Sequence, residues 1–306
     1  MSKTSKKHHG STSHKPRKAT AADWISGARI RTLPLAFAPV AIGSGAAAIT
    51  DQFKAPVALL CLVVALALQI GVNYSNDYSD GIRGTDNYRV GPARLTGSGA
   101  ADPKKVLAVA LTFFALSAVA GIIIVVLTAA WWPLAVGAVA IVAAWFYTGG
   151  RRPYGYAGLG EVMVFIFFGL VATVGTTFVQ TGAFSQESLF GGIGIGLISC
   201  AVLVVNNIRD IETDKLAGKK TLAVRMGRTP SAVLFCFLMI LPFGIVIYFG
   251  LFYSAAFLTL FALLAALPAC LITLTAKTPQ EYILALKLSS LTGLLYGLGL
   301  AFAFFG

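Results

Sequence analysis

The acidic residues of this chain are concentrated in two short stretches. Six of its 12 Asp and Glu residues lie in NDYSDGIRGTD (76–86) and NNIRDIETDKLAGKKTLAVRMG (206–227). Mg²⁺ prefers oxygen ligands and is commonly held by one or two carboxylates together with the phosphates of a substrate. The two stretches therefore predict a pair of metal-binding segments, whose candidate ligands are Asp77, Asp80, Asp86, Asp210 and Asp214.

Basic residues follow the acidic ones in the same part of the sequence. Arg94 comes after the first stretch, Lys219 and Lys220 lie within the second, and Arg151 lies in a glycine-rich segment between them. Lys and Arg neutralise phosphate charge that a metal leaves uncompensated, so acids and bases in this combination describe a phosphate site. For most of these residues an alternative stays open: they could be ordinary residues of cytoplasmic loops, which are basic in membrane proteins in general, without binding phosphate.

The spacing of the acidic residues places them on helix faces. Gln69, Asn73, Asp77 and Asp80 follow one another at intervals of four, four and three, so on a continuous helix they share one face. Asn207, Asp210 and Asp214 repeat this pattern at intervals of three and four. Buried carboxylates without a cation are costly, so both faces are expected to point at a shared interior and not at lipid.

The elements that carry these faces are predicted to be membrane-spanning helices. Hydrophobic residues make up 57% of the chain and charged residues 12%, about half the roughly 25% of soluble domains. Long apolar runs favour helices over the short alternating segments of a barrel. An all-α fold with nine spans is expected, at Leu33–Ile49, Ala55–Asn73, Val106–Ala129, Pro133–Tyr147, Gly158–Val179, Leu189–Val205, Ala232–Gly250, Phe252–Leu274 and Ile283–Phe305.

The net charge of +12 is better explained by topology than by nucleic-acid binding. If the nine spans alternate from a cytoplasmic N-terminus, only Lys54 of the 24 Lys and Arg residues falls on the external side. This asymmetry is the one that the positive-inside rule requires. The acidic stretches and the N-terminus are therefore expected in the cytoplasm and the C-terminus outside, in a bacterial plasma membrane.

The first 22 residues are expected to form a disordered, basic cytoplasmic tail, followed by one nine-helix domain over residues 23–306. The tail is polar and has no apolar region of its own, so no cleaved signal peptide is expected. His8, His9 and His14 are interpreted as solvated residues and not as metal ligands. The four cysteines stand singly within apolar spans, which favours packing roles over disulfides.

The two acidic stretches resemble the Asp-rich motifs of the UbiA superfamily of intramembrane aromatic prenyltransferases. Within it, WISGARIRTLPLAFAPVAIGSGAA, GPARLTGSG and YTGGRRPYGYAGLGE resemble the branch that prenylates 1,4-dihydroxy-2-naphthoate to make menaquinone precursors. The resemblance covers residues 24 to about 300. The general first motif, N-D-x-x-D-x-x-x-D, would end at Gly84, whereas the third carboxylate here is Asp86, a spacing typical of the menaquinone branch.

The resemblance implies a helical bundle around a central cavity that is capped by the cytoplasmic loops and open to lipid for an isoprenoid tail. The segment VMVFIFFGL and the ninth span are expected to supply apolar walls for this tail. Asp77, Asp80, Asp210 and Asp214 would hold Mg²⁺ on the diphosphate of a polyprenyl donor. The residues implied to contact the diphosphate or to orient the carboxylates are Asn73, Arg94, Arg151, Lys219 and Lys220.

The implied reaction joins the donor to the acceptor carbon that carries a carboxylate, which leaves as CO₂ to give demethylmenaquinol. Tyr147, in a Tyr-x-x-x-Arg pattern, is a catalytic candidate, although an interfacial aromatic anchor is an equal alternative. Arg29 or Arg31 could bind the acceptor carboxylate, or could snorkel to the membrane surface. Another acceptor (4-hydroxybenzoate, homogentisate, a tetrapyrrole or a sugar phosphate) and, more distantly, cation transport are the alternative functions.

Overall fold

Helices make up the regular structure of the described residues, 17–88 and 94–306, of this computed structural model, and no strand occurs among them. The expected all-α class is therefore confirmed. Most of the predicted N-terminal tail, including its three histidines, lies outside the described residues. The Ala19 backbone N–H donates to the Ala100 carbonyl at 2.9 Å, which ties the segment before the first helix to a later loop.

The first helices form a bent pair. A capping box at Thr20 starts α1 (Ala21–Gly27), which leads through the short η1 (Ile30–Thr32) into α2 (Pro34–Ala48). The two parts meet at 46°. Arg29, with a φ of 53°, takes the left-handed conformation at the bend, which is uncommon for a residue other than glycine.

The long helix α3 (Ala55–Arg83) continues well past the predicted span and contains most of the first acidic stretch. It ends at Gly84, whose φ of 74° favours glycine. Near this end Gly81 lets a loop approach closely, since a Cβ there would lie 2.3 Å from Thr96 Cγ2. After η2 (Thr85–Tyr88), the helices α4 (Pro103–Thr128) and α5 (Pro133–Phe146) return along α3.

The middle of the chain forms the next pair of spans. After η3 (Tyr154–Ala157), one continuous helix is built from α6 (Gly160–Val164), the π-helical η4 (Phe165–Val171) and α7 (Ala172–Thr181). It is followed by α8 (Gln186–Arg209), which carries the start of the second acidic stretch. The short helices α9 (Ile211–Leu216) and α10 (Leu222–Met226) hold further parts of that stretch, whereas Asp210 precedes α9 and Lys219 and Lys220 lie between the two helices.

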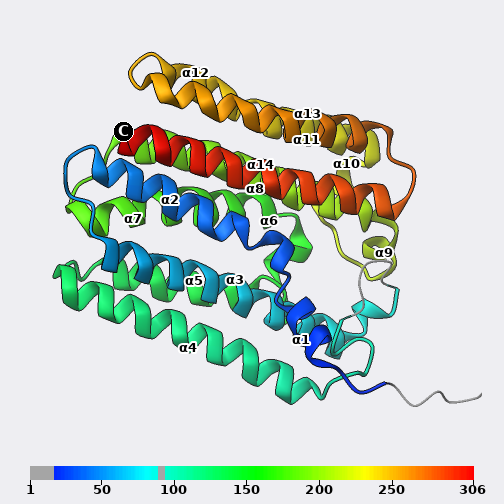
Figure 1. Cartoon of the computed structure of the whole chain (residues 1–306). Helices are drawn as coiled ribbons and strands as arrows, with labels where there is room; N and C mark the ends of the chain where they lie inside the picture. Colours follow the sequence, from blue (N-terminus) through cyan, green and yellow to red (C-terminus); the bar gives the residue numbers. More distant parts are fainter. Residues whose placement is uncertain (1–16, 89–93) are drawn as a thin grey trace, which may run out of the picture.

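The C-terminal part completes the bundle with three spans. They are α11 and α12 (Arg228–Ile240 and Pro242–Gly250), η5 and α13 (Ser254–Ala262 and Leu263–Thr275), and α14 (Pro279–Phe305). Figure 1 shows α14 lying beside both α2 and α8, with α11 to α13 covering them on one side and α3 to α5 on the other. The largest buried apolar cluster joins α2, α8 and α11 to α14.

Seven of the nine predicted spans are helices long and apolar enough to cross a membrane, and the bent α1–α2 pair is an eighth candidate. The remaining prediction, Pro133–Tyr147, corresponds to α5, which has only 14 residues. At about 1.5 Å per residue α5 is roughly 21 Å long, shorter than a hydrocarbon core of about 30 Å. Large apolar side chains such as Leu264 and Leu251 are more than 70% exposed on the outside of the bundle, as expected for a surface that faces lipid.

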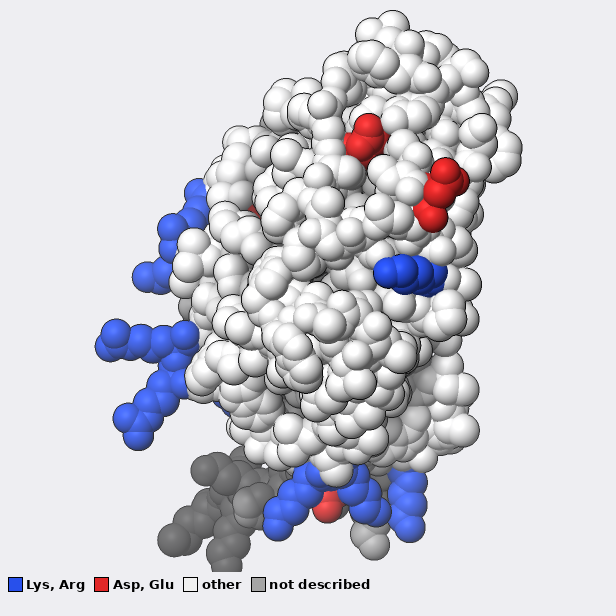
Figure 2. Space-filling model, turned by 90° about the vertical axis from the view of Figure 1, so that its left-hand side faces the viewer, with Lys and Arg blue, Asp and Glu red and all other residues white. Residues whose placement is uncertain are grey.

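Charge is distributed unequally between the two ends of the bundle. We call the end where α3 and α8 finish the motif end, because both acidic stretches lie there, and the opposite end the far end (Figure 1). Figure 2 views the molecule from the far end, where most of the surface is uncharged and few Lys and Arg side chains occur away from the margins.

Candidate active site

The last four turns of α3 carry a buried polar face. Gln69, Asn73, Asp77 and Asp80 are each at most 6% exposed, so the face predicted from their spacing is turned into the protein. The side-chain amides of Gln69 and Asn73 donate to backbone carbonyls of the bend between α1 and α2, at 2.7 and 3.0 Å. These two bonds fix α3 against the bend and set the position of the two carboxylates beyond them.

Asp80 is surrounded by cationic and phenolic donors. Its Oδ2 lies 2.9 Å from Arg94 Nη1 and 3.2 Å from Lys219 Nζ, while Oδ1 accepts a 2.5 Å hydrogen bond from the Tyr156 hydroxyl. Burial and the neighbouring Asp80 carboxylate raise the pKa of Tyr156, so this phenol remains a proton donor at neutral pH. Such charge-assisted bonds offset the cost of burying the carboxylate.

Lys219 brings the two acidic stretches together. Its Nζ is 3.2 Å from Asp80 Oδ2 of the first stretch and 3.8 Å from Asp214 Oδ1 of the second. The same ammonium lies 4.8 Å from the centre of the Tyr156 ring. One cation can therefore contact a carboxylate from each stretch, although the stretches are more than 100 residues apart in the chain.

Asp77 has a different environment from Asp80, one turn away. Both of its carboxylate oxygens accept backbone N–H groups, from Leu95 at 2.9 Å and from Thr96 at 2.8 Å. It thereby anchors the loop that contains Arg94, whose Nε in turn lies 3.4 Å from Asp86 Oδ1. The first stretch and this loop thus form one connected polar unit.

Asp210 forms an ion pair with its own neighbour in sequence. The Arg209 guanidinium donates to both carboxylate oxygens of Asp210, at 2.8 and 2.6 Å, and to Asn206 Oδ1 at 2.9 Å. The Arg209 side chain is only 4% exposed. A buried guanidinium is therefore held at the end of α8, facing the first acidic stretch across the polar cavity described below.

Three of the predicted site residues lie apart from this network. Arg151 and Lys220 are exposed, although the Lys220 backbone N–H donates to the Tyr156 carbonyl at 2.8 Å. Tyr147 packs edge-on against Tyr154, with ring centres 5.5 Å apart. The predicted residues that the structure does bring into or beside the network are Asn73, Asp77, Asp80, Asp86, Arg94, Asp210, Asp214 and Lys219.

Sequence reasoning missed two members of the site. Tyr156 stands in the segment YTGGRRPYGY, where the pattern drew attention to Tyr147 instead. Arg209 directly precedes Asp210 and would have been found by asking which cation neutralises that carboxylate. Its position inside an acidic stretch was the available signal.

A polar cavity of about 430 Å³ opens beside these residues. Its walls come from α1, η1, α3, α8 and the loop after η2, and they bring four arginines around Asn73 and Asp77. The polar and charged residues that line it are Ser26, Arg29, Arg31, Thr32, Gln69, Asn73, Asp77, Arg94, Ser199, Asn206 and Arg209. The excess of arginine makes the cavity suited to an anionic ligand.

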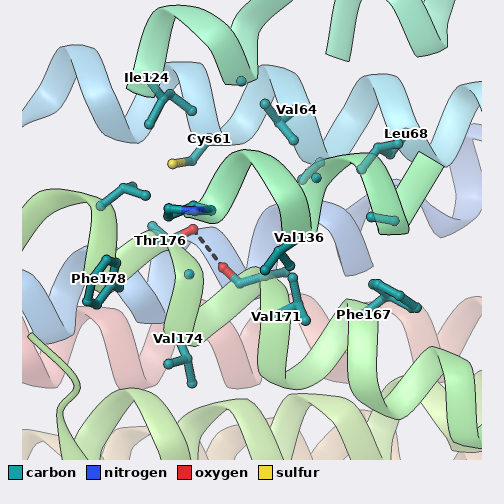
Figure 3. Close-up of a pocket in the computed structure, with 18 of the residues that line it drawn as sticks. Cys61, Val64, Leu68, Ile124, Val136, Phe167, Val171, Val174, Thr176 and Phe178 are labelled. Carbon is teal, nitrogen blue, oxygen red and sulfur yellow. Dashed lines mark hydrogen bonds between the residues drawn. The ribbon is translucent and has the colours of Figure 1, made fainter. Parts of the chain in front are cut away.

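A second cavity, of about 640 Å³, is almost entirely apolar (Figure 3). It lies between α2, α3, α4, α5 and the η4–α7 helix, and of the described residues only Phe168 lines both cavities. The expectation for VMVFIFFGL is supported by Phe167, Phe168 and Leu170 in its wall. The expectation for the ninth span is wrong, because α14 packs on α2, α8 and α13 and contributes only Leu286, to the polar cavity.

The carboxylates of the two acidic stretches are the candidate donors for a metal ion. Among residues 17–88 and 94–306, no group of three or more His, Cys, Asp or Glu side chains is close enough to bind a metal. The five predicted carboxylates thus do not form an all-protein metal cage. Asp80 and Asp214 nevertheless share the ammonium of Lys219, so the site fits a cation that takes one or two carboxylates and completes its coordination with phosphate.

The arrangement defines a class of protein: an integral membrane protein whose arginine-lined cavity adjoins an apolar one, as an enzyme for an anionic, long-tailed substrate requires. The UbiA prenyltransferase family model matches residues 36–281, and the chain belongs to this family. It is 51% identical to the 1,4-dihydroxy-2-naphthoate octaprenyltransferase of Mycobacterium tuberculosis, over 84% of this chain and 83% of that protein. The Escherichia coli protein of the same name is 38% identical, over 67% and 68% of the two chains.

Solved structures with the same fold include a UbiA homolog from Aeropyrum pernix, with a TM-score of 0.67 at 15% identity, covering 87% of this chain and 96% of that one. A UbiA homolog from Archaeoglobus fulgidus, bound to DMAPP and Mg²⁺, gives a TM-score of 0.59 at 16% identity, covering 91% and 99%. At these identities the likeness concerns the fold.

Proposed function

We propose that this chain transfers a polyprenyl group from a polyprenyl diphosphate to 1,4-dihydroxy-2-naphthoate, releasing diphosphate and CO₂ and forming demethylmenaquinol. The relatives of this name, at 51% and 38% identity, support the assignment. The structural observation that carries it is the contact of Lys219 with Asp80 and Asp214, which joins the two acidic stretches into one site. This site adjoins a cavity for an anion and, across Phe168, a cavity for a hydrocarbon.

Mg²⁺ is the proposed cofactor, and Asp80, Asp210 and Asp214 are its proposed ligands, with Asp86 beside them. When bound, it supplies charge neutralisation to the diphosphate and to the leaving group. Arg94 and Lys219, already placed at Asp80, would contact the remaining phosphate oxygens. Asp77 is proposed to act by fixing the Arg94 loop, since its oxygens are engaged by backbone amides.

The proposed reaction begins when the allylic C–O bond of the donor breaks and diphosphate leaves with the electron pair. Arg94, Lys219 and the neutral phenol of Tyr156, which all contact Asp80, are proposed to stabilise the negative charge that develops on the leaving diphosphate. The apolar cavity wall excludes water, which would otherwise capture the allylic cation. The acceptor carbon bearing the carboxylate then bonds to the allylic carbon, and the C–CO₂ bond breaks to return its electrons to the ring.

The acceptor is proposed to enter the polar cavity from the α1 side. Arg29 and Arg31 line that part of the wall and could pair with the acceptor carboxylate. The motif end is proposed to face the cytoplasm of a bacterium, with the C-terminus outside, because the charge asymmetry of the chain favours that orientation. Residues 23–306 are proposed to act as a single domain in the bilayer.

The test is prenylation of 1,4-dihydroxy-2-naphthoate by the purified protein in detergent, with geranyl diphosphate, with and without Mg²⁺. We expect a prenylated, decarboxylated naphthol that requires the metal. The same assay with 4-hydroxybenzoate or homogentisate as acceptor is expected to give none. Turnover of 4-hydroxybenzoate and not of dihydroxynaphthoate would overturn the acceptor, while no release of diphosphate with any acceptor would overturn the enzyme class.

A further inference from the structure

The apolar cavity meets the polar one at a defined point. Phe168, on the π-helical η4, lines both, and along α3 the lining changes directly from Leu68 in the apolar cavity to Gln69 in the polar one. π-Helical turns frequently occur at functional sites because they shift the register of side chains along a helix. A chain attached to a diphosphate in the polar cavity would therefore pass Phe168 to enter the apolar one.

The lining of the apolar cavity suits a hydrocarbon chain. The two hydroxyl side chains in its lining are bonded to nearby backbone: the Thr176 hydroxyl donates to the Ala172 carbonyl at 2.7 Å, drawn in Figure 3, and the Ser117 hydroxyl to the Val64 carbonyl at 3.4 Å. Cavities lined in this way stay dry and accept hydrocarbon.

Three glycines from three different helices line the cavity. Gly121 lies on α4, Gly137 on α5 and Gly175 on α7. A Cβ added at any of them would meet no atom within 4 Å, so these glycines are not required by close helix packing. Glycine in a helix interior is less stable than alanine by about 1 kcal/mol. At these three positions the missing side chain leaves cavity space unfilled.

Gly121 and Gly137 lie in the halves of α4 and α5 nearer the far end, and Gly175 lies in the corresponding half of the continuous helix 160–181. Gly175 is seven residues beyond Phe168, about 10 Å along the helix. Beyond it, Phe178 packs against Trp132 and Phe184, with ring centres 4.8 and 5.0 Å away, and all three rings line the cavity. Figure 3 shows Phe178 and Phe167 at opposite ends of the view. The glycines therefore keep open the half of the cavity that ends at these aromatic rings.

We propose that Gly121, Gly137 and Gly175 are specificity-determining residues that set the length of the prenyl chain the enzyme accepts, an inference that rests on the proposed function. The first isoprene units occupy the region around Phe168 and do not reach the glycines. Later units occupy the space beside them. A larger side chain at any of the three positions shortens the usable cavity and discriminates against long donors only.

The experiment compares geranyl diphosphate with octaprenyl diphosphate as donors for Gly121→Leu, Gly137→Leu and Gly175→Leu. We expect kcat/KM for the long donor to fall by about tenfold or more, since a misfit of one or a few methylenes in an apolar pocket is worth about 10- to 200-fold. The value for the short donor should stay within about twofold of the parent. Alanine variants at the same positions should shift the ratio in the same direction by less, and they carry the test if a leucine variant does not fold.

Gly244→Leu is the matched control, because Gly244 lies on α12 away from this cavity and a Cβ there would also meet no atom within 4 Å. It should leave the ratio of the two donors unchanged. An unchanged ratio in the three cavity variants, or an equal loss with both donors, would overturn the inference while leaving the proposed function intact. If the parent protein turns over neither donor, the proposed function itself fails.

Discussion

The regions around Asp77 and Asp80 differ sharply, although the two carboxylates are one helical turn apart. Asp77 is capped by the backbone amides of Leu95 and Thr96, whereas Asp80 is lined by the side chains of Arg94, Lys219 and Tyr156. An amide cap fixes a loop in place, but its N–H groups cannot move away to admit a metal without unfolding that loop. Cationic side chains, in contrast, can give way to a metal ion and phosphate without any change in the backbone. One Asp-rich motif can therefore divide its carboxylates between fixing a loop and binding a ligand.

Asp80→Ala should have the largest effect on turnover. It removes the carboxylate that gathers the cations from both stretches, and we expect kcat/KM to fall by about 100-fold or more, the scale for loss of a preorganised electrostatic group. Glu212→Ala is the control, because Glu212 belongs to the second stretch but its side chain is 71% exposed. A similar loss in both variants would contradict the special position of Asp80.

Asp77→Asn should instead lower the thermal stability of the protein more than its turnover. The asparagine can accept one of the two backbone N–H groups and leaves the other buried without its partner, at a cost of about 1–3 kcal/mol. We expect a lower temperature of thermal inactivation in detergent, with turnover at low temperature reduced less than in Asp80→Asn. If Asp77→Asn keeps the parent's thermal stability but loses all turnover, Asp77 is a ligand and not an anchor.

Lys219→Ala and Lys220→Ala form a pair that tests the contact between the stretches. Lys219 bridges Asp80 and Asp214, whereas the Lys220 side chain is exposed. Loss of a partly buried ion pair of about 2 kcal/mol corresponds to roughly 30-fold in kcat/KM for Lys219→Ala. Lys220→Ala should stay within about twofold, as surface charges contribute little. Equal effects in steady-state assays would place both lysines, or neither, at the diphosphate.

Tyr156→Phe should have the smallest effect that is still measurable. It removes one hydrogen bond to a charged group, and we expect the low end of the usual range, about 1.5 kcal/mol, which corresponds to about a tenfold loss in kcat. Because its pKa is raised above the usual value of about 10, the phenol stays protonated below that value, and its contribution is lost only as pH rises through the raised pKa. A pH–rate profile of the parent between pH 6 and 9 should therefore show no step that Tyr156→Phe abolishes.

The sequence predicts the helical faces well and the contacts between distant segments poorly. The intervals between Gln69, Asn73, Asp77 and Asp80 are enough to place them on one buried face, because helical periodicity is local. The amide cap of Asp77 depends on how the loop after η2 folds back, which no pattern within α3 encodes. Phe168 reaches both cavities from a π-helical turn, and a periodicity of 3.6 residues does not predict such a shift in register.

The span lengths show the same division between local and tertiary information. Apolar runs identify the helices, but α3 continues to Arg83 because its polar end is buried by the Arg94 loop and α4. The apolar character of Pro133–Tyr147 predicts a span, although the helix found there, α5, has only 14 residues. Tertiary packing likewise decides that Arg151 is exposed and that the Arg209 side chain is buried. The residue type alone, arginine in both cases, does not predict which one is buried.

We propose that the two acidic stretches form one diphosphate site. A double-mutant cycle with Asp80→Asn and Asp214→Asn measures whether the two carboxylates act together. The measurement is kcat/KM for prenylation of dihydroxynaphthoate at saturating Mg²⁺ in the parent, both single variants and the double variant. Residues that act as a unit are strongly non-additive, so we predict that the double variant loses little more than the worse single variant. Losses that multiply, as for independent sites, or an Asp214→Asn variant with parental activity would contradict the account.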